Sequence, residues 1–166
     1  MLSAPASSAV ALSQDGATYA YCPPGRRVQL YSTATGRTEE LRREAPYSTA
    51  ICAAGQRLVL SADGRRLIHT AVGRTSTLWD VPSRTAVREF TAASVEALSP
   101  DGALAVEVTE TQFKVRDDKD TSSSAFLLGF PRLDTDGRAI NLSLAFDADS
   151  RCCGTCPGTA RCVPWT

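Results

Sequence analysis

Short apolar runs separated by turn residues recur along the chain, and the clearest series lies between Leu58 and Phe90. It contains four runs, at 58–60, 67–72, 77–81 and 86–90. The segments between the runs are rich in turn-forming residues, as in Ala62-Asp63-Gly64. Runs of this length with turn signals between them predict four short strands in an antiparallel meander.

The same pattern is repeated elsewhere, each time around an Asp-Gly pair. These pairs begin at positions 15, 63, 101 and 136, at intervals of 48, 38 and 35 residues. A Leu-Ser-x tripeptide precedes the first three pairs. An Asp-Gly turn suits a two-residue hairpin because Gly adopts positive φ freely and Asp tolerates it. The repetition predicts several copies of one meander that bury their apolar faces on each other.

The third run of the clearest unit ends in Trp79-Asp80, and Tyr31-Ser32 and Arg116-Asp117 occupy the corresponding place in two other units. One Trp-Asp pair in a four-strand unit of about 40–45 residues is typical of WD40 repeats. The chain resembles this family over most of its length. The resemblance implies an all-β fold: a WD40-like β-propeller or partial propeller of about four antiparallel four-stranded blades, the last incomplete.

In the WD40 family the indole N–H of this tryptophan belongs to a hydrogen-bond network with Ser or Thr, His and Asp. Trp79 is present here, and Thr70 or Ser76 could serve as the hydroxyl partner. No Gly-His pair precedes the blades, and His69 is the single histidine of the chain. The resemblance therefore implies degenerate repeats in which this network is incomplete.

We expect a single domain over 1–166. It divides into a tail at 1–7, blades at 8–44, 45–92 and 93–130, and an incomplete blade at 131–166. The predicted strands are 10–13, 17–21, 28–32 and 38–42 in the first blade, 95–99, 103–108, 112–117 and 125–130 in the third, and 142–146, 151–156 and 160–165 in the last.

Two of these units depart from a regular four-stranded blade. The second blade carries extra material at 45–56, which we interpret either as an added edge strand over 49–53 or as a long connection between blades. The last blade lacks its outer strand, so an open edge and uncovered blade faces would remain. Three alternatives stay open: the N-terminal strand completes that blade, another chain supplies the rest of the propeller, or the natural protein is longer than this sequence. The number of blades in the closed assembly is not set by the sequence.

The charge balance narrows the classes of partner. The 166 residues, enough for one domain with a core of ordinary size, include 18 basic and 18 acidic side chains. A neutral chain does not favour a broad electrostatic surface for DNA, RNA or anionic lipid, so direct nucleic-acid binding is not expected, although a ribonucleoprotein setting stays open. No apolar run has the length needed to span a bilayer. The N-terminal residues lack the positive region of a secretory signal.

Six cysteines are present. With no secretory signal, we expect free thiols in a reducing compartment and a cytoplasmic location. Four of them, Cys152, Cys153, Cys156 and Cys162, form a C-terminal cluster that contains a C-x-x-C pair. Such a cluster could hold zinc, or form a disulfide or redox pair. Buried packing is the favoured interpretation, because adjacent residues of a strand point to opposite sides.

No residue is assigned a catalytic, cofactor-binding or metal-binding role, and no cofactor is expected. His69 lies within a predicted strand, and no motif supplies partners for a Ser-His-acid or Cys-His site. The basic pairs Arg26-Arg27, Arg42-Arg43 and Arg65-Arg66 could line one rim and contact an acidic partner or RNA phosphate, although ordinary surface charge is the favoured interpretation.

The resemblance implies a non-enzymatic scaffold for protein partners, as a subunit of a larger assembly. Loops held on a rigid framework can bind without a large ordering cost, which suits this role. Two alternatives remain open: a zinc-binding module built on the C-terminal cysteines, and small-molecule binding or hydrolysis at the channel of the propeller. The sequence does not name the partner, the pathway or the binding face.

Overall fold

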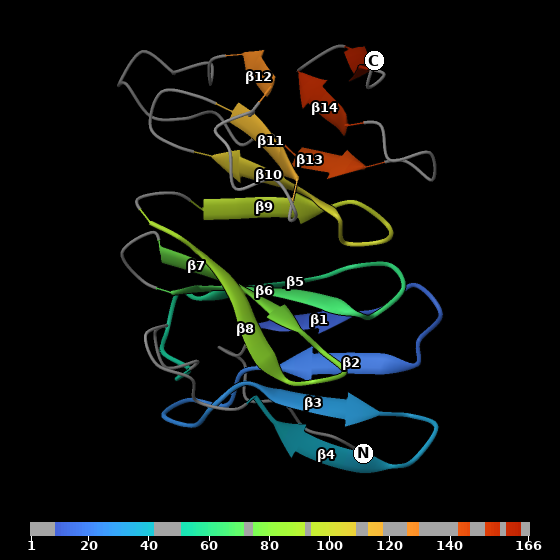
Figure 1. Cartoon of the computed structure of the whole chain (residues 1–166), viewed down its shortest axis with the longest axis vertical. Helices are drawn as coiled ribbons and strands as arrows, with labels where there is room; N and C mark the ends of the chain where they lie inside the picture. The colour runs from blue at the N-terminus through green and yellow to red at the C-terminus, as the bar shows by residue number, and fades with distance from the viewer. Residues whose placement is uncertain are drawn as a thin grey trace.

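The computed structural model describes residues 9–41, 51–71, 75–91, 94–108, 113–117, 126–129, 143–146, 152–156 and 159–163. Every regular element in these ranges is a β-strand. The strands form four antiparallel sheets that follow one another in chain order (Figure 1). Within each sheet, strands that are neighbours in the sequence are also hydrogen-bonded neighbours.

The sheets are numbered 1 to 4 along the chain. Sheet 1 consists of β1 (Val10–Leu12), β2 (Thr18–Tyr21), β3 (Gln29–Ser32) and β4 (Arg37–Glu40). Sheet 2 consists of β5 (Arg57–Leu60), β6 (Arg66–Ala71), β7 (Thr75–Asp80) and β8 (Thr85–Phe90). Sheet 3 consists of β9 (Ser94–Leu98), β10 (Leu104–Val108), β11 (Phe113–Asp117) and β12 (Phe126–Gly129). Sheet 4 consists of β13 (Ser143–Phe146), β14 (Cys152–Cys156) and β15 (Thr159–Val163).

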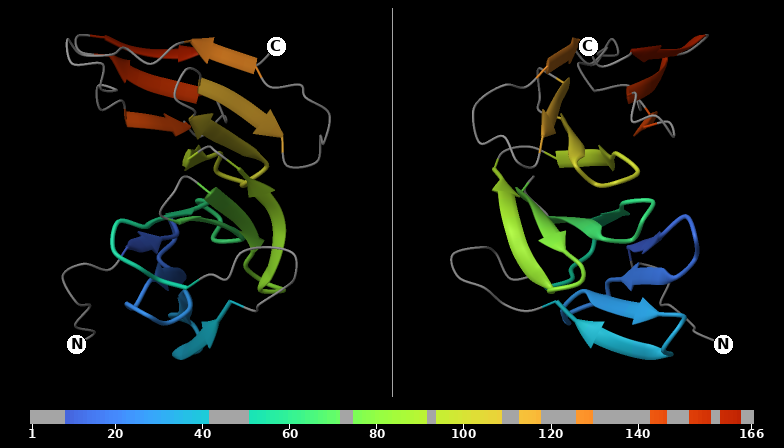
Figure 2. Two further views of the ribbon diagram at one scale, coloured as in Figure 1. Left: turned by 90° about the vertical axis from the view of Figure 1, so that its left-hand side faces the viewer. Right: turned by 45° about the vertical axis from the view of Figure 1, so that its right-hand side comes forward.

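The expected all-β architecture is confirmed, and each of these strands lies within two residues of a predicted one. The first strands of the sheets, β1, β5, β9 and β13, contact one another in that order. They make an inner row from which the other strands extend outwards. Sheets 1 and 4 lie at opposite ends of this arrangement in the views of Figures 1 and 2.

The hydrophobic core is divided into three clusters, each between two neighbouring sheets. Their principal members are Ala20, Leu30, Leu67 and Trp79 between sheets 1 and 2; Ile68, Leu78, Val95 and Ala105 between sheets 2 and 3; and Ala97, Val106, Val115 and Phe146 between sheets 3 and 4. Alternate residues of one strand enter different clusters, because successive side chains point to opposite faces. Both faces of sheets 2 and 3 are therefore covered, and each large apolar side chain buried there contributes about 1.5–3 kcal/mol.

The extra material of the second unit is only partly described, because residues 42–50 lie outside the described ranges. Ile51 forms an isolated bridge with Arg27, and no strand forms between this bridge and β5 at Arg57. The described part of the insertion is thus a connection that leads into sheet 2. The division into one domain with the expected blade boundaries stays a prediction.

Candidate interaction surface

The three described Asp-Gly turns share one hydrogen-bond pattern. In the first turn, the Ser13 hydroxyl donates to Oδ1 of Asp15 at 2.6 Å and accepts from the backbone N–H of Thr18 at 2.9 Å. Oδ1 of Asp15 also accepts from the N–H of Ala17 at 2.9 Å. The Ser13 hydroxyl and then the Ala17 N–H hold the pKa of Asp15 below its ordinary value. Ser61 and Asp63 repeat these contacts, as do Ser99 and Asp101.

These turns correct one detail of the sequence interpretation. The glycines have φ of 69° at Gly16, 70° at Gly64 and 71° at Gly102, as expected. The aspartates do not share this conformation, because Arg84 is the one residue other than glycine with positive φ in the described ranges. The turns are therefore longer than two-residue hairpins. Asp is needed for its side chain, which caps backbone N–H groups inside the turn.

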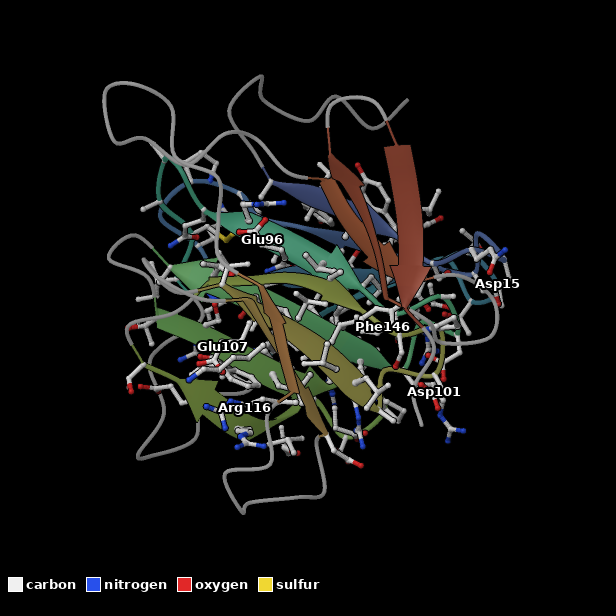
Figure 3. All side chains as sticks on the ribbon, turned by 90° about the horizontal axis from the view of Figure 1, so that it is seen from above. Asp15, Glu96, Asp101, Glu107, Arg116 and Phe146 are labelled. Carbon is white, nitrogen blue, oxygen red and sulfur yellow. A yellow bond between two sulfur atoms is a disulfide. The ribbon has the colours of Figure 1, made fainter. Side chains whose placement is uncertain are left out.

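Neighbouring turns are also joined to each other along one end of the sheets. The N–H of Gln14 donates to the carbonyl of Ala62 at 3.0 Å, and the N–H of Asp63 donates to the carbonyl of Pro100 at 3.1 Å. Figure 3 shows Asp15 and Asp101 on the same side of the molecule. We call this row, made of residues 13–17, 61–65 and 99–103, the turn rim.

The glycines of the turn rim allow this close approach. A Cβ on Gly64 would lie 3.0 Å from Oγ1 of Thr18, and a Cβ on Gly102 would lie 2.4 Å from Cγ of Arg66. The second and third turns therefore each pack against the turn region of the preceding sheet, where a side chain would not fit. The turn rim fixes the relative positions of sheets 1, 2 and 3 by hydrogen bonds as well as by apolar contacts.

A cavity of about 310 Å³ opens between sheet 1 and the β7–β8 turn of sheet 2. Leu30 and Val81 supply apolar lining, Thr18 supplies a hydroxyl group, and Arg37 and Glu39 supply one charge of each sign. Oε2 of Glu39 also pairs with Nη1 of Arg84 at 3.3 Å, which ties β4 to the β7–β8 turn. The volume lies near the lower end of the range typical of ligand pockets, roughly 300–1,000 Å³.

Comparison with solved structures identifies the architecture. The β-propeller domain of Cps50 (Swd1) from Myceliophteria thermophila matches with a TM-score of 0.64 and 18% identity, over 93% of this chain and 50% of that chain. A chain of the mitotic checkpoint complex matches with a TM-score of 0.59 and 14% identity, over 88% of this chain and 42% of that chain. The fold is that of a WD40-like β-propeller. The chain spans about half the length of these structures. No protein-family model and no curated protein matches the sequence.

His69 is buried within sheet 2 of this propeller. It lies on β6 with 1% of its surface exposed, and its Nε2 is 2.9 Å from Oε1 of Gln56. Burial lowers the pKa of His69 to about 4, so the ring is neutral at physiological pH. Sequence reasoning missed Gln56. The signal for it was the Gly55-Gln56 pair, which precedes β5 where the WD40 pattern has Gly-His.

Trp79 is completely buried between sheets 1 and 2, where the family pattern places an aromatic residue. Its indole Nε1 has no hydrogen-bond partner among the described residues, and neither has Nδ1 of His69. Thr70 and Ser76 bond to each other at 2.9 Å on the face of sheet 2 that contacts sheet 3. The incomplete network inferred from the resemblance is therefore observed at Trp79.

Asp80, the partner of Trp79 in the motif, organises the β7–β8 turn. It accepts hydrogen bonds from the N–H and hydroxyl of Ser83 at 3.0 and 2.6 Å, and it pairs with Arg66. Burial alone would raise the pKa of Asp80, but the bonds from Ser83 and the charge of Arg66 outweigh it and hold that pKa below its ordinary value. Asp80 thus joins β6 to the turn that follows β7.

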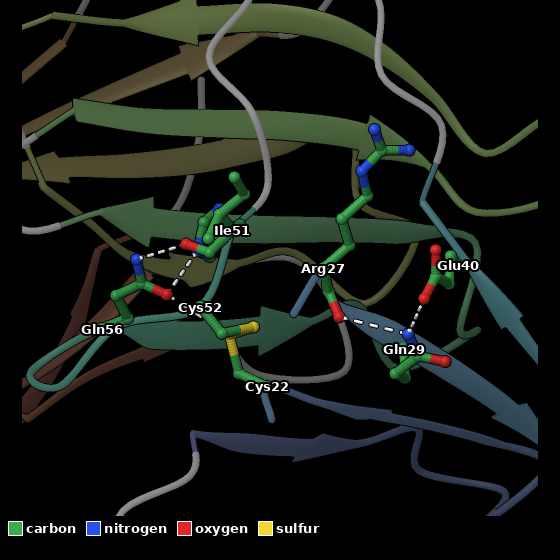
Figure 4. Close-up of a disulfide and its surroundings, with 8 residues drawn as sticks. Cys22, Arg27, Gln29, Glu40, Ile51, Cys52 and Gln56 are labelled. Atoms are coloured by element: carbon green, nitrogen blue, oxygen red, sulfur yellow. Dashed lines mark hydrogen bonds between the residues drawn. A yellow bond between two sulfur atoms is a disulfide. The ribbon is translucent and has the colours of Figure 1, made fainter. Parts of the chain in front are cut away.

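The expectation of free thiols is wrong for two cysteines. Cys22 and Cys52 form a disulfide with a Cα–Cα distance of 5.3 Å, although 30 residues separate them. Backbone bonds bring them together, because the N–H of Gly25 donates to the carbonyl of Cys52 at 2.8 Å and the N–H of Cys52 donates to that of Arg26 at 2.7 Å. Nε2 of Gln56 donates to the carbonyl of Ile51 at 2.8 Å beside this disulfide (Figure 4).

The C-terminal cysteines lie on described backbone, but their side chains lie outside what the structure describes. Cys152, Cys153 and Cys156 are on β14, and the register places Cys153 opposite Cys162 of β15. No group of three or more potential metal ligands comes together among the residues whose side chains are described. The alternatives weighed for this cluster stay predictions.

The basic pairs do not form one rim. Arg26-Arg27 lies in the β2–β3 turn, whereas Arg65 belongs to the turn rim and Arg66 begins β6, at the other end of the strands. Arg66 pairs with Asp80. Arg42-Arg43 lies outside the described ranges. Within the part of the chain that the structure covers, no helix has the length and apolar character to cross a bilayer.

Proposed function

We propose that this chain is a non-enzymatic protein-interaction module and a subunit of a larger assembly. The turn rim supports this proposal most directly, because hydrogen bonds and glycine contacts lock three blades into a rigid framework. A rigid framework presents binding side chains without a large loss of conformational entropy on binding. One of the matched structures is a chain of the mitotic checkpoint complex, which is an assembly of proteins.

We place the partner at the cavity between sheets 1 and 2. Leu30 and Val81 offer apolar contact, and Glu39 is already paired with Arg84. The Arg37 guanidinium is then the group that recognises an acidic side chain of the partner. The chain has formal net charge zero, which favours such a local contact over a broad electrostatic surface for nucleic acid.

A catalytic alternative based on histidine has no support, because the single histidine is buried and bonded to Gln56. The cytoplasmic location expected from the sequence stays a prediction. The Cys22–Cys52 pair offers a test of it, since a reducing cytosol keeps most thiols unpaired. Peptide mapping of protein alkylated in intact cells shows whether this pair is linked there.

The proposed function is tested by affinity capture with cross-linking and quantitative mass spectrometry. Arg37→Glu is compared with wild type and with Arg26→Glu, a matched change at an exposed arginine of the β2–β3 turn. We expect at least one protein to be captured by wild type and by Arg26→Glu but to be lost from Arg37→Glu. Identical capture by all three forms would contradict the assigned surface. Turnover of hydrolase substrates by the purified chain would contradict the non-enzymatic role.

A further inference from the structure

The β3–β4 turn of sheet 1 and the β7–β8 turn of sheet 2 are built alike. Each joins the third strand of its sheet to the outer strand, over residues 32–37 in sheet 1 and 80–85 in sheet 2. The residue just before the outer strand has a left-handed conformation in both, with a φ of 67° at Gly36 and 62° at Arg84. The two turns can therefore be compared residue by residue.

A carboxylate organises this region in sheet 2. Asp80 ends β7, pairs with Arg66 of the neighbouring strand, and accepts hydrogen bonds from the N–H and the hydroxyl of Ser83. Sheet 3 also has a carboxylate at this position, because Asp117 ends β11. An aspartate at the end of the third strand is thus the rule in these two sheets.

Sheet 1 has Ser32 at this position. The register places Ser32 between Thr18 and Arg37, in the row where Arg66 and Asp80 lie side by side in sheet 2. A Cβ added to the glycine of the following turn would meet Thr18 in one case and Arg66 in the other, so both rows face the following sheet. Threonine and serine are smaller than arginine and aspartate. The cavity of about 310 Å³ lies over them, where sheet 2 has its ion pair.

The groups that line this cavity suit a carboxylate. Thr18, Ser32 and Thr35 supply hydroxyls, and Arg37 supplies a guanidinium. Thr35 corresponds to the serine that donates two hydrogen bonds to the carboxylate in sheet 2. The side chains of Thr18, Ser32 and Arg37 have no hydrogen-bond or ion-pair partner among the described residues. They are therefore available to a ligand.

The charge around the cavity favours a carboxylate over a phosphoryl group. Arg37 and Glu39 both line the cavity, and Glu39 is paired with Arg84 at 3.3 Å. One monoanion therefore neutralises the set. A phosphoryl group carries about two negative charges, and Glu39 would repel the second one, because it lies two residues from Arg37 on the same face of β4.

We infer that this cavity is a receptor for a single carboxylate group, supplied by an aspartate or glutamate side chain of the partner. The carboxylate takes the place that Asp80 has in sheet 2. It accepts hydrogen bonds from the hydroxyls of Ser32 and Thr35 and pairs with the guanidinium of Arg37. The inference rests on the proposed function. It adds the chemical group that is recognised, and it makes Ser32 the residue that determines specificity.

Binding of small probes to the purified chain tests the chemistry of this receptor. The first probe is N-acetyl-aspartic acid with its α-carboxyl group amidated, and its asparagine and phosphoserine counterparts are the other two. We expect the aspartate probe to cause saturable NMR shifts at the N–H groups of Ser32, Thr35 and Arg37. Its affinity should exceed that of the other two probes roughly tenfold or more. No saturable shift with the aspartate probe overturns the inference, and so does equal or tighter binding of either counterpart.

A variant that carries its own carboxylate tests the position. Ser32→Asp should weaken binding of the aspartate probe roughly tenfold or more, because its side chain occupies the guanidinium of Arg37 and repels a second carboxylate. Thr38→Asp adds the same charge on the opposite face of β4 and should leave probe affinity unchanged. Urea unfolding should show Ser32→Asp to be at least as stable as Thr38→Asp. Equal probe affinities for the two variants overturn the inference.

These measurements use no partner protein, so they separate the inference from the proposed function. Binding of the aspartate probe by a chain that captures no protein contradicts the proposed function alone. Arg37-dependent capture of a protein, without preference for the aspartate probe, contradicts the inference alone. If both hold, Ser32→Asp should lose the same protein that Arg37→Glu loses, and Thr38→Asp should retain it.

Discussion

Gly102 of one turn lies directly against Arg66 of the preceding sheet. A Cβ at position 102 would be 2.4 Å from Cγ and 2.5 Å from Cβ of Arg66, and the glycine has a φ of +71°. Backbone conformation and close contact therefore both select glycine at this position. At Gly36 only the backbone conformation selects glycine, since its φ is +67° and nothing lies within 4 Å of an added Cβ.

Gly102→Ala should destabilise the fold more than Gly36→Ala. The left-handed conformation costs about 1–2 kcal/mol in both variants, and the contact with Arg66 adds about 1–3 kcal/mol at position 102 because packed atoms must shift. Urea unfolding measures the difference as a change in midpoint at constant slope. Equal free energies of unfolding for the two variants would show that the turns are not in contact.

Trp79→Phe should be tolerated far better than Trp79→Ala. Removal of the whole side chain from a completely buried site costs about 3–5 kcal/mol. Phenylalanine retains most of the apolar contact and removes an indole N–H that has no partner among the described residues, so we expect a change within about 1 kcal/mol. Thermal and urea unfolding of the two variants check this. A loss of several kcal/mol in Trp79→Phe would mean that the N–H is bonded.

The stability of the fold should fall as the pH is lowered from about 6.5 to about 4. Burial lowers the pKa of His69 from 6.5 to about 4, so the unfolded chain binds a proton in this interval and the folded chain does not. The folded state therefore loses about 3 kcal/mol across the interval and regains none of it at lower pH. His69→Gln should flatten the pH dependence between these values. An unchanged slope in that variant would assign the effect to other groups.

Loss of the Cys22–Cys52 disulfide should reduce stability by about 3 kcal/mol, because the bond closes a loop between residues 30 positions apart. The double variant Cys22→Ala and Cys52→Ala should reproduce the effect of reductant on the wild type. In the double variant, reductant should no longer lower stability by breaking this bond. Unfolding in urea with and without dithiothreitol measures both. If reductant left wild-type stability unchanged, the pair would not be linked in solution.

Much of the fold was predictable because the same pattern of apolar runs and turn residues recurs in several repeats. Even the strands of the last sheet lie at the positions predicted for them, since apolar runs and turn residues alternate at the spacing of short strands. The hydrogen bonds within the turns were less evident. The Leu-Ser-x tripeptides were recognised as a repeat, but the role of Ser13 as the partner of Asp15 depends on side-chain direction, which a sequence pattern does not show.

Contacts between distant residues were the part that sequence reasoning missed. Cys22 and Cys52 meet because the Arg27–Ile51 bridge returns the insertion to the β2–β3 turn, and no periodicity marks that return. The pairing of Gln56 with His69 was missed for a similar reason, because it joins the residue before β5 to the middle of β6. The boundaries of the domain, the location and the cysteine cluster stay predictions.

Each junction of the turn rim joins two neighbouring sheets, through one N–H, one carbonyl and one glycine. A duplication of one blade in the gene would therefore create a further junction of the same kind and leave the existing ones intact. Loss of a whole blade would likewise bring together two turns that can form a junction of the same kind. Blade number in such a protein can change by whole units during evolution, whereas a change of one residue within a turn disturbs two neighbours at once.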